Sequence, residues 1–189
     1  MRVLLVSANR EQIPDPVFPL GLAYIAAALR NAGHQLDVVD LCFGRHPLRA
    51  LREQVTVFRP DIIGLSLRNI DNAAYPLTVD YLSLHREVVD ALREVSHAPL
   101  VLGGSGFSIL PEAYMQALGG DWGIAGEGEQ TFVYLLAALE QGDAGGAHRM
   151  RRESPAASRR GGRLVGSGRR VGTPLRPRRH DRPRRADLG

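Results

Sequence analysis

The sequence contains no lysine and a single cysteine, Cys42, in 189 residues. Without lysine the chain cannot supply the phosphate-binding side chain of a Walker A motif, which excludes that class of nucleotide site. One cysteine excludes a disulfide framework and any metal centre that needs several thiolates from this chain. No stretch reaches the roughly 18 uncharged apolar residues of a membrane span, and the opening M-R-V-L-L-V-S is too short and strand-like for a signal peptide, so we expect a cytoplasmic protein.

Positive charge is scarce in the first part of the chain and dense in the last. Residues 1–148 hold ten arginines against seventeen acids, whereas residues 149–189 hold fourteen against three. Residues 143–189 also contain no aromatic residue and no isoleucine. Such a segment cannot bury enough apolar surface to offset its conformational entropy, so we expect it to be disordered. It could bind nucleic acid, serve as a linker, or be out-of-frame translation, and the abrupt change in composition favours the last interpretation.

In residues 1–142, short apolar runs alternate with segments whose apolar residues recur at helical spacing. The expected strands are residues 3–6, 36–39, 61–67, 100–102 and 121–125, and the expected helices are residues 19–32, 48–58, 81–95, 110–118 and 130–140. Alternation of this kind predicts a parallel sheet covered by helices on both faces. We therefore predict a three-layer, doubly wound α/β domain with five parallel strands over residues 1–142, followed by an Arg/Gly/Pro-rich tail over residues 143–189.

The most informative stretch is P-L-V-L-G-G-S-G-F-S, residues 99–108, where an apolar run breaks directly into glycines. Glycine lets a ligand approach bare backbone, and open α/β sheets bind ligands beyond the carboxyl ends of their strands. We expect the other strand exits, residues 7–21, 66–72 and 126–129, to converge on the same edge. A tight strand-to-helix turn is the structural alternative.

The sequence gives little support for other common types of binding or catalytic site. The dinucleotide motif G-x-G-x-x-G is absent after the first expected strand, where the sequence reads S-A-N-R-E-Q. Glu127 and Glu129 could form a carboxylate pair, but acids are also favoured at the start of a helix. His46 is the one histidine expected near the carboxyl edge, and Cys42 on the same loop is more typical of a small buried hydrophobe. We predict no catalytic residue and no protein metal ligand.

Four segments in order resemble one known family. P-L-G-L-A-Y-I-A-A-A-L (19–29), D-I-I-G-L-S (61–66), V-L-G-G-S-G-F-S (101–108) and G-E-G-E-Q-T-F (126–132) are similar to the N-terminal cobalamin-binding domain of B12-dependent radical SAM proteins. The resemblance covers about residues 1–141. It implies a flavodoxin-like fold with strand order 2-1-3-4-5 and cobalamin at the carboxyl edge.

The resemblance also implies roles for particular residues. Ser66 would line a pocket for the nucleotide tail, and glycines after the fourth strand would let that tail pass. The first loop would face the corrin, and the loop after the fifth strand would close the other side. Together with neighbouring residues of these loops, the candidate cofactor-binding residues are Ser7, Pro19, Gly21, Ser66, Leu67, Asn69, Gly103, Gly104, Gly106, Gly126 and Glu127.

Two departures from related proteins bear on mechanism. Better-known cobalamin carriers have D-x-H-x-x-G after the first strand, but residues 7–18 contain no histidine, so we predict cobalamin bound without a protein histidine ligand. The catalytic barrel of the family carries C-x-x-x-C-x-x-C for a [4Fe-4S] cluster that cleaves S-adenosylmethionine, and one cysteine cannot supply it. We therefore expect a cobalamin-binding fragment of a radical SAM methyltransferase or related enzyme, not catalytic alone, whose partner would be the barrel. The alternative is a non-catalytic interaction or regulatory domain whose basic tail binds nucleic acid.

Overall fold

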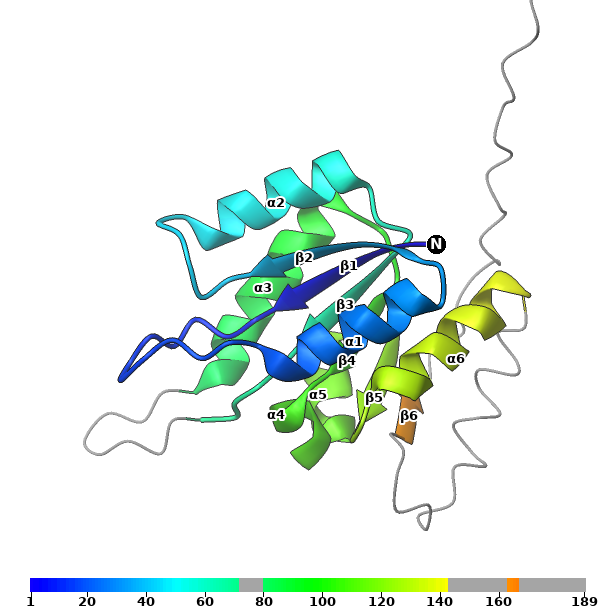
Figure 1. Cartoon of the computed structure of the whole chain (residues 1–189). Helices are drawn as coiled ribbons and strands as arrows, with labels where there is room; N and C mark the ends of the chain where they lie inside the picture. The colour runs from blue at the N-terminus through cyan, green and yellow to red at the C-terminus, as the bar shows by residue number, and fades with distance from the viewer. Residues whose placement is uncertain (72–79, 143–162, 167–189) are drawn as a thin grey trace, which may run out of the picture.

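Leucine-, valine- and isoleucine-rich runs form the strands of this protein, and amphipathic segments between them form the helices. A computed structural model describes residues 1–71, 80–142 and 163–166 (Figure 1). The strands are β1 (Arg2–Ser7), β2 (Gln35–Asp40), β3 (Ile62–Ser66), β4 (Leu100–Gly103), β5 (Trp122–Ala125) and β6 (Arg163–Gly166). The helices are α1 (Leu20–Asn31), α2 (Pro47–Phe58), α3 (Tyr81–Val95), α4 (Ser105–Ile109), α5 (Pro111–Leu118) and α6 (Glu129–Glu140).

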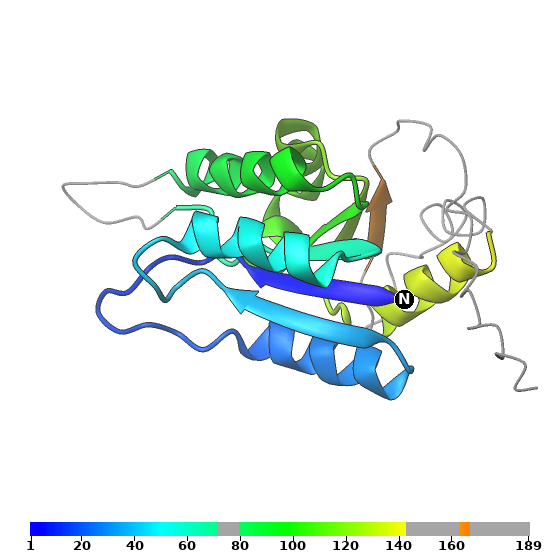
Figure 2. The same cartoon turned by 90° about the horizontal axis from the view of Figure 1, so that it is seen from above.

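The described strands form one sheet in the order β2-β1-β3-β4-β5-β6. The first five are parallel, so the predicted strand order 2-1-3-4-5 is confirmed. α1 and α6 cover one face, and α2 and α3 cover the other (Figure 2). The three-layer α/β architecture is therefore confirmed as well, and it brings the carboxyl ends of five parallel strands to one edge.

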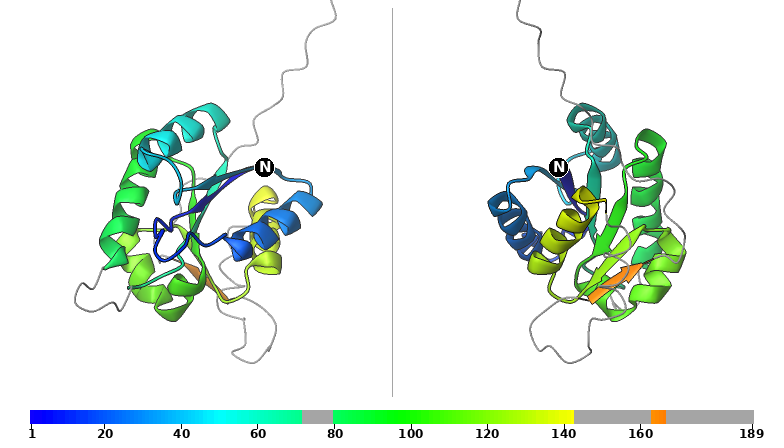
Figure 3. Two further views of the ribbon diagram at one scale, coloured as in Figure 1. Left: turned by 60° about the vertical axis from the view of Figure 1, so that its left-hand side comes forward. Right: turned by 90° about the vertical axis from the view of Figure 1, so that its right-hand side faces the viewer.

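The sixth strand was not predicted. β6 pairs antiparallel with β5, buries Leu164 and Val165, and lies at the edge of the sheet (Figure 3). Arg163 adds an ion pair with Glu112 on α5, at 2.8 Å. The expectation of disorder over residues 143–189 is thus wrong for residues 163–166, because two buried apolar side chains and a ladder of backbone hydrogen bonds offset the entropy of ordering them. The rest of that expectation, and the question of reading frame, lie outside the described residues.

Alternate residues of the strands pack into two apolar cores, one on each face. Leu4 and Val6 of β1 join Leu51 and Val88 from α2 and α3, whereas Leu5 packs with residues of α1 and α6. α3 begins at a typical N-cap, where the Asp80 carboxylate accepts a hydrogen bond from the Leu82 amide at 2.9 Å. In the described part of the chain, no helix combines the length and the apolar character needed to cross a membrane.

Candidate functional site

A cavity of about 720 Å³ lies between the carboxyl half of the sheet and the N-terminal ends of α1 and α6. This size falls within the roughly 300–1,000 Å³ of typical ligand pockets. α1 and α6 lie side by side on this face in both views of Figure 3. The cavity is therefore at the edge where the sequence predicts a site.

Side-chain size explains why the sheet is hollow here. On this face the strands carry large residues toward their amino ends, such as Ile62, Val101 and Trp122, which fill the core. Toward the carboxyl ends the same face carries the small residues Ser7, Ser66, Gly103 and Gly126, which line the cavity. Gly64, which is in register with Val101, lines it as well. Ser7, Ser66 and Gly103 stand next to one another across β1, β3 and β4. Because the side chains on this face become smaller toward the carboxyl ends of the strands, they leave a space that α1 and α6 do not fill.

Eight of the eleven predicted site residues line this one cavity: Ser7, Pro19, Gly21, Ser66, Gly103, Gly104, Gly126 and Glu127. They come from four separate strand exits, so the predicted convergence of those loops is observed. Their role in binding a cofactor stays a prediction.

The other three predicted residues do not line the cavity. Leu67 is fully buried in the core on the opposite face of the sheet. Asn69 hydrogen-bonds the Tyr81 hydroxyl, and a Cβ on Gly106 would lie 2.9 Å from the Arg68 carbonyl oxygen, because α4 packs against the loop after β3. These residues hold two loops together at the edge of the cavity.

Gly104 is the clearest case of backbone geometry that only glycine permits. Its φ is +102°, and a Cβ there would lie 2.6 Å from the Leu67 carbonyl oxygen. Leu67 in turn donates its amide to the Gly103 carbonyl at 2.7 Å and accepts the Gly106 amide at 2.9 Å. The loops after β3 and β4 are therefore clamped together by backbone contacts, which fixes this side of the cavity.

Ser108 connects the loops after β4 and β5. Its hydroxyl donates to the Gly104 carbonyl at 2.8 Å and accepts the Gly126 amide at 2.9 Å. The side chain lines the cavity with both of these hydrogen bonds made. Ser108 thus holds two glycine-containing loops at a fixed separation.

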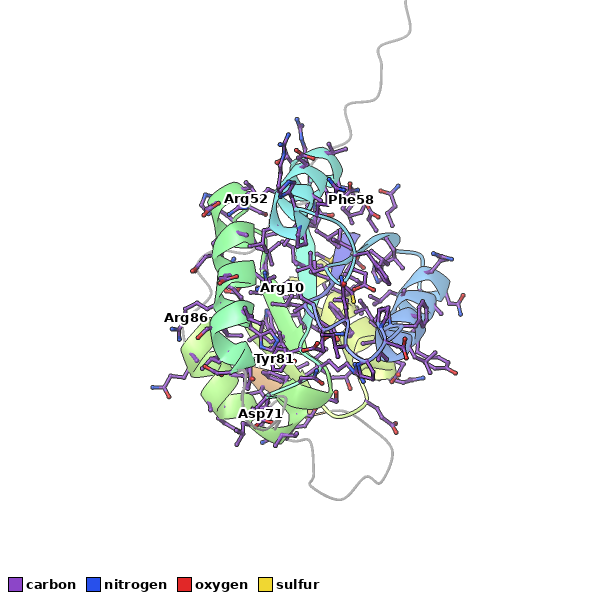
Figure 4. The ribbon with its side chains drawn as sticks, turned by 90° about the vertical axis from the view of Figure 1, so that its left-hand side faces the viewer. Arg10, Arg52, Phe58, Asp71, Tyr81 and Arg86 are labelled. Carbon is purple, nitrogen blue, oxygen red and sulfur yellow. The ribbon has the colours of Figure 1, made fainter. Side chains whose placement is uncertain are left out.

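The loop between β1 and α1 is anchored by polar contacts to α3. The Tyr81 hydroxyl donates to the Glu11 carboxylate at 2.6 Å, and Arg10 pairs with Glu87 at 2.8 Å. Figure 4 shows Arg10 and Tyr81 on the α3 side of the molecule. The Tyr81 hydrogen bond lowers the pKa of Glu11, while burial, followed by that same bond, raises the pKa of Tyr81 to about 12. Neutral tyrosine and charged glutamate therefore persist across the physiological pH range.

The buried thiol of Cys42 donates to the Glu11 carbonyl at 3.4 Å, and burial raises the pKa of this thiol. Thiolates rather than thiols act as nucleophiles and metal ligands. Cys42 is thus a buried structural residue, as its sequence context favoured. Across the described residues, no three His, Cys, Asp or Glu side chains gather in a group that could hold a metal ion.

His85 on α3 makes the stability of the fold depend on pH. It is 2% exposed between the rings of Tyr81 and Tyr114, and burial lowers its pKa from 6.5 to about 4. Between these two values the unfolded chain binds a proton that the folded chain does not. The contribution of neutral His85 is therefore complete above pH 6.5 and is lost as the pH falls toward 4.

We expect the melting temperature of the protein to fall between pH 6.5 and pH 4, and His85→Phe to reduce that fall. The difference in unfolding free energy between the two proteins should change by up to about 3 kcal/mol across this range. Thermal unfolding at half-unit pH steps measures it, with exposed His97→Gln as the control. Parallel pH profiles for wild type and His85→Phe would contradict the assignment.

Several residues that line the cavity were not among the predicted site residues. They include Asn9, Val17, Phe18, Gly64, Arg68 and Phe132. The period-two pattern of a strand was the available signal for Asn9 and Gly64, because Leu5, Ser7 and Asn9 alternate, as do Gly64 and Ser66. Phe132 belongs to the apolar stripe of α6, and its position against Gly64 could not be read from that stripe.

Known proteins match this chain over the same region. A tryptophan 2-C-methyltransferase from Streptomyces laurentii is 33% identical over 135 residues, which cover 71% of this chain and 22% of that protein. Two structures of the radical S-adenosylmethionine methyltransferase TsrM from Kitasatospora setae match with 32% identity and a TM-score of 0.69. One holds tryptophan and a SAM analog, and the other holds cobalamin and a [4Fe-4S] cluster.

The TsrM matches cover 75% of this chain but only 26% and 25% of those proteins. A structure of the cobalamin-dependent S-adenosylmethionine radical enzyme OxsB, at 21% identity and a TM-score of 0.58, shares the fold. This chain therefore spans about a quarter or less of the length of these relatives. The model of the B12 binding domain family matches residues 6–136, which include every strand exit around the cavity. The chain belongs to the B12-binding domain family.

Proposed function

We propose that this chain binds cobalamin at the cavity, as the cofactor-binding part of a B12-dependent radical SAM enzyme that transfers methyl groups or performs related radical chemistry. The observation that carries the proposal is the cavity itself, formed by small residues at the carboxyl edge of a fold that belongs to the B12-binding domain family. The TsrM structure with cobalamin bound supports it, since it shares 32% identity with this chain.

The residues present suit the two parts of the cofactor. Gly64, Ser66 and Gly103 line the deeper wall against the sheet, where the narrow nucleotide tail would enter. Val17 and Phe18 line the outer side, where the broad corrin would rest. When bound, cobalamin supplies a cobalt centre able to carry a methyl group. The protein's own residues would orient the cofactor and exclude water from one of its faces.

We further propose that this chain gives the cobalt no histidine ligand. The loop of residues 7–18 contains no histidine, and among the described residues the cavity is lined by none. Arg68 lines the cavity, but an arginine side chain has no lone pair to offer the metal.

A radical SAM barrel is the partner we propose for the outer surface. Ile13, Phe18, Leu20 and Tyr24 are 81%, 69%, 58% and 58% exposed on the first loop and α1, and Phe18 and Leu20 line the cavity. Exposed apolar clusters of this kind mark contact surfaces. Because the chain has one cysteine, the [4Fe-4S] cluster and S-adenosylmethionine would bind to the barrel. The identity of the methyl acceptor would then depend on residues outside this sequence.

The test is to mix the full chain with hydroxocobalamin, separate the two by gel filtration and record the visible spectrum of the protein fraction. We expect about one cobalamin per chain, with the spectrum of a corrin that lacks histidine coordination. No retained colour on folded protein would contradict cobalamin binding by this chain. A histidine-ligated spectrum would contradict the ligand assignment alone.

A further inference from the structure

We propose that the side-chain amide of Asn9 donates a hydrogen bond to an oxygen atom of the bound cobalamin and so positions the cofactor. The inference rests on the proposed function and adds a residue to it. It follows from the position of Asn9, from the partner of its carbonyl oxygen and from the missing partner of its amino group.

Asn9 lies two residues beyond Ser7, just past the end of β1. Leu5, Ser7 and Asn9 follow the alternation of the strand, and all three line the cavity. Asn9 is only 6% exposed. A polar side chain this buried ordinarily has hydrogen-bond partners for its donors and acceptors.

The carbonyl oxygen of the Asn9 side chain already has a hydrogen-bond partner. Its Oδ1 accepts the backbone amide of Glu11 at 3.3 Å. Because a backbone N–H can donate only to an acceptor, this contact places the oxygen toward Glu11 and leaves the amino group as the free end. The Tyr81 hydroxyl on α3 donates to the Glu11 carboxylate and so anchors the loop that holds Glu11. The Glu11 amide that fixes the orientation of the Asn9 side chain is therefore itself held in place.

The amino group of Asn9 has no partner in the described structure. Among the described residues that line the cavity, Asn9 is the one with a buried side-chain atom in this condition. Ser108, by contrast, makes two hydrogen bonds. A buried donor without an acceptor opposes folding, and an oxygen of a ligand in the cavity would satisfy it.

Cobalamin offers oxygen acceptors of two kinds, the carbonyls of the amide side chains around the corrin and the phosphate of the nucleotide tail. Both accept from a neutral amide N–H. Asn9 is thereby a positioning residue, which acts on the affinity and orientation of the cofactor.

Two variants of the full chain test this inference. Asn9→Asp keeps an oxygen for the Glu11 amide but replaces the donor with an acceptor. Asn9→Leu removes both polar atoms at similar volume. Spectroscopic titration with hydroxocobalamin should show each variant binding at least tenfold more weakly than wild type. Asn31→Asp, which makes the same change at an exposed position of α1, should bind as wild type does.

The melting temperature of the cobalamin-free protein separates positioning from folding. We expect Asn9→Leu to melt close to the wild-type temperature even though it binds cobalamin more weakly, because removal of the unpaired buried donor offsets the loss of the acceptor for the Glu11 amide. If Asn9→Asp does not fold, Asn9→Leu alone decides the question. Wild-type affinity in a folded Asn9→Leu protein would overturn the inference, as would a loss of affinity that only follows a loss of folding.

Cobinamide, which lacks the nucleotide tail, distinguishes the two acceptors. A tenfold loss that persists with cobinamide places the acceptor on the corrin, and a loss seen only with cobalamin places it on the tail. Both results support the inference. If the wild-type chain binds neither compound, the proposed function fails, and that result differs from equal binding by wild type and variants.

Discussion

Replacing Gly21 with tryptophan will abolish cobalamin retention without unfolding the protein. Gly21 lies in the first turn of α1 and lines the cavity, and a Cβ placed on it would meet no atom within 4 Å. An indole at this position has room to extend into the space proposed for the cofactor. We expect at least a hundredfold loss of affinity for hydroxocobalamin by spectroscopic titration, with an unchanged far-UV circular dichroism spectrum.

Gly21→Ala is the matched control for this prediction. Its methyl group meets no neighbour, and alanine stabilises a helix relative to glycine by up to about 1 kcal/mol. We expect a slightly higher melting temperature and an affinity close to that of wild type. Full cobalamin binding by a folded Gly21→Trp protein would place the cofactor somewhere other than this cavity.

Replacing Gly104 with alanine will destabilise the fold by about 3 kcal/mol. The substitution forces a side chain into a left-handed backbone conformation and places its Cβ 2.6 Å from a backbone oxygen that cannot move independently. The clamp between the loops after β3 and β4 would open. Equilibrium unfolding in urea measures the loss, and we expect weaker cobalamin binding to accompany it.

The neighbouring Gly103→Ala provides the comparison. A Cβ on Gly103 would lie 3.5 Å from the Ile124 carbonyl oxygen, which is ordinary contact, and its φ is not positive. We expect a change in unfolding free energy below about 1 kcal/mol. Equal stability of the two alanine variants would show that the geometry at Gly104 does not restrict that position to glycine.

Periodicity in the sequence predicted the fold because both faces of the sheet are covered. Buried parallel strands produce continuous apolar runs, and the helices between them carry regular stripes, so five strands and their order could be predicted. β6 could not, since its signal is only Leu164 and Val165 within an arginine-rich segment. Its order depends on pairing with β5, which is distant in sequence.

The sequence predicted which loops border the cavity but not which of their side chains line it. Ser66 and Leu67 are adjacent in sequence, yet they face opposite sides of the sheet, and strict alternation along β3 would have separated them. Asn69 and Gly106 were grouped with the cavity because their loops border it. Packing of α4 against the loop after β3 gives Gly106 a structural contact instead.

The measurement that tests the central claim most directly is a crystal structure of the full chain grown with hydroxocobalamin. Its result locates the cofactor without reference to any variant. We predict electron density for the nucleotide tail between the N-terminal end of α1 and the small residues Ser66 and Gly103, with the corrin over the first loop and no histidine at the cobalt. Cobalamin bound elsewhere on the chain, with this cavity empty, would contradict the account.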